Sequence, residues 1–69
     1  MDDITRKAIM NYLNLTHVDH IHEYAYNKLN IRHFIYVIGN RSVSILVDDN
    51  SLLPYIRKNK ILKLNGKIS

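Results

Sequence analysis

Histidines are the residues of this chain with the most versatile chemistry, and they stand at positions 17, 20, 22 and 33. His17, His20 and His22 precede Glu23 closely enough to suggest a metal site. In a helix, His17 and His20 would share one face, because residues three apart are neighbours. His22 would then point about 200° away from His20, and the chain has no cysteine thiolate for a structural zinc. We therefore expect no metal ion and no other cofactor, and we interpret the histidines as facing solvent or a nucleic-acid groove.

The residue types of a hydrolytic site are present, but their arrangement does not indicate catalysis. Asp48 and Asp49 stand in a polar stretch that is typical of a turn, where aspartates cap the backbone. Neither a Ser-His-Asp triad nor a catalytic carboxylate pair is supported. A chain this short buries only about 60% of its unfolded surface, so a large enclosed pocket would leave too little core. We expect a protein that is not an enzyme and has no catalytic residue.

The basic residues are concentrated at the C-terminal end. The formal net charge is +4, and residues 53–69 carry no acidic side chain. Their basic residues are Arg57, Lys58, Lys60, Lys63 and Lys67. A patch of one sign attracts polyanions through contacts that need no sequence information. A solvated charged tail is the alternative explanation.

Length and composition indicate one small domain. The chain has 69 residues, 46% of them hydrophobic, and no cysteine to form a stabilising disulfide. Domains of this size often need such help, so a homodimer is a reasonable expectation. Met1-Asp2-Asp3 lacks the basic start of a signal peptide, so none is expected, and the longest apolar run, residues 34–38, is too short to span a bilayer. We expect a cytoplasmic location, associated with the nucleoid of a prokaryotic or virus-infected host, without membrane binding.

Two helices are predicted in the N-terminal half. The first is expected to be capped by Thr5, to carry an apolar stripe of Ala8, Ile9, Tyr12 and Leu13, and to end near Leu13. Asn14 follows and tolerates the left-handed conformation by which a chain leaves a helix. The second is predicted over residues 17–28. Thr16 and Asp19 resemble a capping box at its start. Its apolar residues recur at helical spacing, and they are Val18, Ile21, Ala25 and Leu29.

A hairpin and a short helix are predicted in the second half. Residues 34–38 and 43–47 are rich in β-formers and flank a turn at residues 39–42. Leu52 and Leu53 with Tyr55 and Ile56 predict a short third helix. Residues 60–68 suit a strand or an extended arm, with a turn at Asn65-Gly66.

This order of elements resembles a minimal winged helix-turn-helix, and residues 5–58 resemble the small excisionase and MerR-like DNA-binding family. The residues that carry the resemblance are Thr5, Tyr12-Leu13-Asn14-Leu15-Thr16, Val37-Ile38-Gly39-Asn40-Arg41, Leu52 and Tyr55-Ile56. The fold class is therefore expected to be α+β. A winged helix-turn-helix domain would span residues 1–58, followed by a basic arm or strand over residues 59–69.

The resemblance implies that the helix over residues 17–28 enters the major groove of DNA and that the turn at residues 39–42 touches the backbone or minor groove. On the outward face of that helix, His17, His20 and Tyr24 would lie beside Asn27, the residue best suited to adenine. Asn40 and Arg41 would contact the DNA from the hairpin tip, and Arg32 would bind the DNA backbone nearby. The DNA phosphates would be bound along the basic arm by Arg57, Lys58, Lys60 and Lys63. A plain solvent face on the second helix is the alternative.

The leading hypothesis is a double-stranded DNA-binding architectural protein, similar to an excisionase of a phage or mobile element. Its partners would be duplex DNA, an integrase or recombinase, and further copies assembled cooperatively on DNA. The alternatives are a small transcriptional regulator and a protein-interaction module or inhibitor of the same fold. Single-strand binding by stacking is a secondary hypothesis, because Tyr12 and Tyr55 fall on predicted core faces and leave only Tyr24, Tyr26 and Tyr36.

Overall fold

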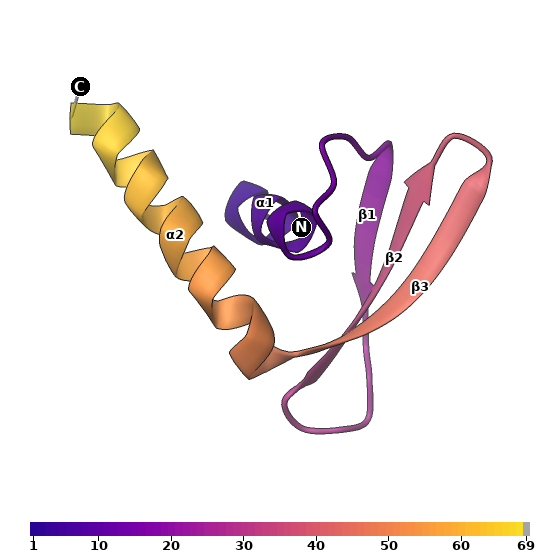
Figure 1. The fold of residues 1–69 in the computed structure, drawn as a ribbon. Coiled ribbons are helices and arrows are strands. Elements are labelled where there is room, and N and C mark those ends of the chain that lie inside the picture. The colour runs from indigo at the N-terminus through magenta and orange to yellow at the C-terminus, as the bar shows by residue number, and fades with distance from the viewer. Residues whose placement is uncertain (69) are drawn as a thin grey trace.

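Two helices and three strands follow one another in the order α1-β1-β2-β3-α2. The computed structural model describes the backbone of residues 1–68 and the side chains of residues 1–64. The elements are α1 (Asp3–Tyr12), β1 (His20–Tyr24), β2 (Ile31–Ile38), β3 (Arg41–Asp48) and α2 (Asp49–Ile68). Figure 1 shows that both helices lie on one side of the antiparallel sheet, whose strand order is β1-β2-β3.

The first helix forms close to its predicted place, with a different cap. The Oδ1 atom of Asp2 accepts a hydrogen bond from the backbone N–H of Thr5 at 2.7 Å, so Asp2 caps α1 and the predicted Thr5 cap is wrong. The apolar stripe is confirmed at Ala8 and Ile9, which are both fully buried, but Tyr12, also expected on a core face, is 38% exposed. Asn14 adopts a φ of 57°, which confirms the left-handed exit from the helix.

The predicted second helix over residues 17–28 is wrong. Residues 20–24 form β1, which pairs antiparallel with residues 33–37 of β2. The side chain of Asp19 does not cap a helix, because its Oδ2 accepts the N–H of Gly39 at 2.6 Å. Leu29, expected on the buried stripe, is 92% exposed. The backbone pairing with β2 outweighs a weak local helix pattern, since propensity is readily overridden by tertiary contacts.

The predicted hairpin is confirmed in β2 and β3. Their register runs from Ile38 opposite Arg41 to Ile31 opposite Asp48. Gly39 and Asn40 form the two-residue turn, and the φ of 58° at Gly39 is a conformation that glycine adopts without steric cost. A positive φ at the first turn residue is typical of a type II′ turn, whose twist matches that of the strands.

The C-terminal element is one helix of 20 residues, α2, instead of a short helix and an arm. The predicted strand or arm over residues 60–68, with its turn at Asn65-Gly66, is therefore wrong. Leu52, expected in a short helix, lies in α2 and is buried in the core, with Tyr55 and Ile56 packed against it. Over the residues described, neither helix combines the length and the apolar character of a membrane-spanning segment.

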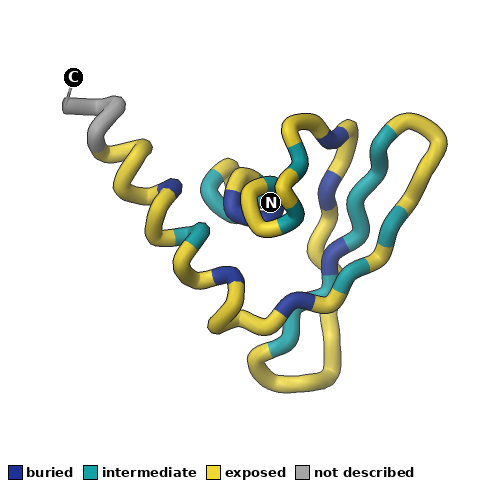
Figure 2. The backbone as a smooth tube through the Cα atoms, viewed as in Figure 1, coloured by how far each residue is buried: buried dark blue, intermediate teal, exposed yellow. Residues whose placement is uncertain are grey.

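The core lies between the helices and one face of the sheet (Figure 2). Its buried apolar residues are Ala8, Ile9, Val18, Ile21, Phe34, Val47 and Leu52. The winged helix-turn-helix is wrong, because the chain has a three-stranded sheet where that fold needs a second helix and places both helices against the same sheet face. The other face of the sheet carries no helix or strand of the described chain.

The orientation of α2 leads to a test with two adjacent leucines. Leu52 is fully buried and Leu53 is 38% exposed. Leu52→Ala should lower the free energy of unfolding by about 2–5 kcal/mol, because it leaves a cavity, whereas Leu53→Ala should change it by about 0.5 kcal/mol or less. Urea unfolding followed by circular dichroism measures both, and equal losses would contradict this packing of α2.

Candidate functional site

Side-chain alternation divides the sheet into a helix-facing face and an open face. Cross-strand partners point to the same side of a sheet, and successive residues point to opposite sides. The helix-facing face includes the buried Ile21, Phe34 and Val47. On the open face lie His20, His22, Tyr24, Ile31, His33, Ile35, Val37, Ser42, Ser44, Leu46 and Asp48.

Five rings form a continuous cluster on the open face. We define the ring cluster as His20, His22, Tyr24, Tyr26 and His33. His20 and His22 are stacked with an interplanar angle of 20° and a centroid distance of 6.4 Å. The ring centroid of Tyr24 lies 6.4 Å from that of His22 and 5.9 Å from that of His33. The ring centroids of His33 and Tyr26 are 6.1 Å apart. Four of the five are exposed, and His33 is half-buried, so the cluster offers ring surface to a ligand.

His33 is held in place by a serine. Its Nε2 lies 2.7 Å from the Oγ of Ser44 on the neighbouring strand. A nucleophilic serine also needs a group that orients the histidine and donors for the oxyanion. Among the described side chains, no carboxylate is hydrogen-bonded to His33. This contact therefore orients a ring and does not build a hydrolytic site.

The histidines do not gather around a common point. Within the described part of the chain, no three histidine or carboxylate side chains are placed to hold a metal ion. His20 and His22 lie side by side on one face, because they are two residues apart on a strand. His17 lies before β1, with its Nε2 2.9 Å from Oδ1 of Asp19.

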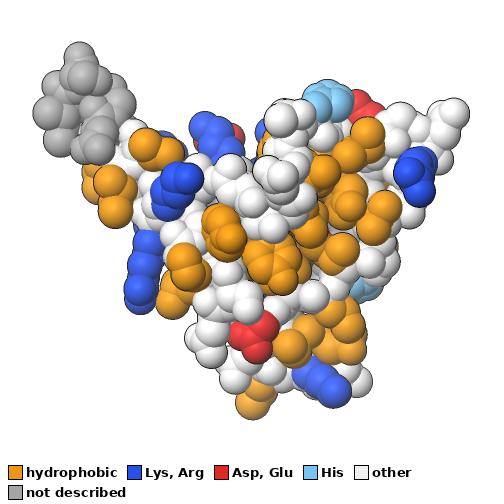
Figure 3. All heavy atoms as spheres, in the orientation of Figure 1, with side chains coloured by type: hydrophobic (Ala, Val, Ile, Leu, Met, Phe, Trp, Pro, Cys, Tyr) orange, Lys and Arg blue, Asp and Glu red, His pale blue; other side chains and the backbone are white. Residues whose placement is uncertain are grey.

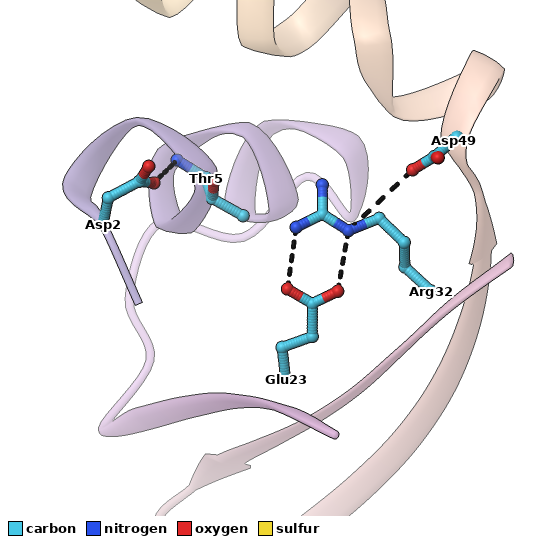
Figure 4. Close-up of polar contacts among 5 residues, drawn as sticks. All are labelled: Asp2, Thr5, Glu23, Arg32 and Asp49. Atoms are coloured by element: carbon cyan, nitrogen blue, oxygen red, sulfur yellow. Dashed lines mark hydrogen bonds and ion pairs between the residues drawn. The ribbon is translucent and has the colours of Figure 1, made fainter. Parts of the chain in front are cut away.

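An ion pair on the helix-facing side ties β1 to β2. The Nε and NH2 groups of Arg32 donate to the two carboxylate oxygens of Glu23 at 2.8 and 2.7 Å (Figure 4). The guanidinium also lies 5.2 Å from the ring centre of Phe34 and 3.9 Å from Oδ1 of Asp49. Hydrogen bonds from Arg32 hold the pKa of Glu23 below its ordinary value. Arg32, predicted to hold a DNA backbone, is thus engaged within the protein.

A second carboxylate connects β1 to the hairpin turn. Asp19 accepts the N–H of Gly39 with one oxygen and contacts His17 with the other. These contacts, the Gly39 hydrogen bond above all, lower the pKa of Asp19. Asn40 is exposed in the turn, and Arg41 begins β3 with its side chain on the helix-facing side, beside Tyr36, Ile38 and Val43. Arg41, predicted to contact DNA from the hairpin turn, therefore points to the side of the sheet opposite to the ring cluster.

The C-terminal basic residues lie on α2. Arg57, Lys58, Lys60 and Lys63 are all exposed. Exposed apolar residues lie among them, with Ile61 at 58%, Leu62 at 56% and Leu64 at 59%. Figure 3 shows basic and apolar side chains together along this helix. Because α2 lies on the helix side of the sheet, where it packs mainly against α1, this surface and the ring cluster belong to opposite sides of the molecule.

The structure brings together only part of the predicted site. His20 and Tyr24 share the open face, whereas Asn27 lies in the loop between β1 and β2. His22 and His33 lie beside these two residues and were not predicted as site residues from the sequence. A signal was available in His20-x-His22-x-Tyr24, whose period of two is that of one face of a strand.

Comparison with known proteins gave no match to this chain, whether to a family model, to a curated protein or to a solved structure. The resemblance to the excisionase and MerR-like family stays a prediction from sequence.

The Glu23–Arg32 pair leads to a prediction on pH. Because the pKa of Glu23 is lowered in the folded chain, its stabilising effect is fully present above the ordinary pKa of a glutamate and is lost as the pH falls through the lowered value. Glu23→Gln should cost about 1 kcal/mol at neutral pH, a value that allows for partial exposure of the pair. The cost should shrink in acid, as measured by urea unfolding across pH. A cost that is the same at acid and neutral pH would contradict this role.

Proposed function

We propose that this chain binds single-stranded nucleic acid on the open face of its sheet. The observation that carries the proposal is the ring cluster, in which exposed tyrosine and histidine rings lie next to one another on a face without a covering helix. A role in binding, and not in catalysis, fits a chain of this size. In this proposal the binding surface is the open face of the sheet, and not a recognition helix over residues 17–28.

Stacking supports the proposal on physical grounds. Unpaired bases expose π faces that stack on aromatic side chains, and sheets that display aromatics are used in this way for single strands. Tyr24 is 49% exposed and Tyr26 is 39% exposed, so both rings keep surface for a base. Leu46, 54% exposed on the same face, extends the apolar surface beside them.

The charge distribution is compatible with a polyanion. Two of the acidic side chains are neutralised locally, since Asp3 pairs with Lys7 and Glu23 with Arg32. By register, Asp48 at the end of β3 is the one carboxylate among the strand residues of the open face. Lys28 lies in the loop between β1 and β2 and forms no ion pair with the described side chains. Phosphates of a strand bound beside the rings would meet this lysine.

Duplex binding, as an excisionase or a transcriptional regulator, stays a prediction. The way in which the chain was expected to bind the duplex requires a helix that the structure does not contain. That mode placed residues 17–28 in the major groove as a helix, and residues 20–24 are a strand. A flat face with exposed rings suits bases that are not already stacked within a duplex. The basic surface of α2 would attract the phosphates of either form of nucleic acid.

A protein-interaction module is the second candidate, and exposed apolar residues favour it. Ile61, Leu62 and Leu64 on α2 are all more than half exposed. Apolar side chains set among lysines suit a partner surface that is apolar and acidic. This candidate requires no nucleic acid, so the same titrations distinguish it from the proposal.

The proposal is tested by fluorescence anisotropy with labelled single strands of DNA and RNA and a duplex of the same sequence, at two salt concentrations. The chain should bind single strands more tightly than duplex, and binding should weaken as salt is raised. Tyr24→Leu should weaken single-strand binding by about 1–3 kcal/mol, or roughly 5- to 150-fold in Kd, because it removes a stacking ring.

Tyr12→Leu is the matched control. Tyr12 is also a partly exposed tyrosine, at 38%, but it packs edge-on against Tyr55 between the helices. Its replacement should leave the Kd unchanged, with folding checked by circular dichroism. Absence of single-strand binding at low salt, or equal effects of the two replacements, would refute the ring cluster as the binding site. Duplex binding that depends on α2 lysines alone would favour the earlier hypothesis.

A further inference from the structure

The free edge of β3 is the longest unpaired strand edge of the molecule. β3 has eight residues and pairs with β2 on one side only, because the strand order is β1-β2-β3. Figure 1 shows that this edge faces away from both helices. Strand edges carry unpaired N–H and C=O groups that can pair with another strand.

The register identifies which groups point outward. Ile38 and Arg41 close a two-residue turn, and in antiparallel pairs hydrogen-bonded and non-hydrogen-bonded positions alternate. The odd-numbered residues of β3 therefore bond to β2, and the N–H of Asp49 continues this pattern by donating to the carbonyl oxygen of Asn30 at 2.8 Å. The backbone groups of Ser42, Ser44, Leu46 and Asp48 point away from β2, toward the free edge.

The middle of this edge lacks the features that usually keep sheet edges apart, because the charged residues of β3 stand at its two ends, Arg41 and Asp48. Residues 41–48 contain no proline and no lysine, and β3 pairs with β2 residue by residue without a bulge. Leu46, more than half exposed, lies in the middle of the strand. An open edge of this length can form backbone hydrogen bonds with a further strand.

We propose that β3 pairs antiparallel with β3 of a second copy of this chain, about a twofold axis between the two Ile45 residues. In this register Ser44 lies opposite Leu46 of the other copy, and all outward backbone groups of the strand find partners. Arg41, which forms no ion pair with the described side chains, comes opposite Asp49 of the other copy. This charge match occurs at both ends of the ladder, since a twofold interface repeats each contact.

The dimer has two consequences for the fold. The twofold axis runs perpendicular to the sheet, so both open faces lie on the same side of one six-stranded sheet and both helix pairs on the other. The two ring clusters then belong to one surface. The pairing also supplies the stabilisation that small domains without disulfides commonly obtain from oligomerisation.

Single-cysteine variants of the full chain test the pairing, because the chain has no native cysteine. Ile45→Cys places two thiols in a non-hydrogen-bonded pair, where Cα atoms lie about 4.5 Å apart, within the range for a disulfide. Mild oxidation should link it as a dimer on a nonreducing gel. Ser42→Cys is the control, since its two copies would lie about 20 Å apart along the ladder. It should remain unlinked although residue 42 is the more exposed of the two.

Sedimentation equilibrium without nucleic acid completes the test. The unmodified chain should sediment as a dimer, Leu46→Ala should remain one, and Leu46→Pro should shift toward monomer, because proline removes an outward N–H and leaves the ladder with β2 intact. A monomeric unmodified chain would overturn the proposal. So would equal cross-linking of Ile45→Cys and Ser42→Cys.

Discussion

The pairing of β1 with β2 is the interaction on which the rest of the structure depends. It places residues 20–24 opposite residues 33–37, and side-chain contacts hold the two ends of the pairing. At one end Asp19 binds the turn at Gly39, and at the other Glu23 accepts two hydrogen bonds from Arg32. Because a shift of one residue would move every side chain to the opposite face, these contacts also protect the register.

That register separates the two roles of β1. Ile21 joins the core beneath the helices, while His20 and His22 point to the open face. In a helix the same residues would be distributed around a cylinder and the rings could not form one row. The binding surface proposed here is thus a direct result of the strand periodicity, and it needs no pocket.

The division between covered and open faces also explains why parts of the surface are not needed to form the core. A core of seven buried apolar residues needs only one face of the sheet and one side of each helix. The open face, the edge of β3 and the outer side of α2 remain available for contacts with other molecules. A chain of this size without disulfides gains stability when such surfaces are covered.

The sequence by itself determined the elements whose contacts are local. The first helix with its left-handed exit at Asn14, the β2–β3 hairpin around Gly39, and a helix through Leu52 and Ile56 all follow from short-range patterns, and the structure contains each of them. Only the tertiary structure decided the state of residues 17–28 and the length of α2. Val18, Ile21 and Ala25 have helical spacing, while His20, Ile21 and His22 alternate as in a strand, so the local pattern was ambiguous. The backbone groups of β2 resolved it by offering hydrogen bonds from residues that lie outside residues 17–28, a contribution that the local pattern does not contain.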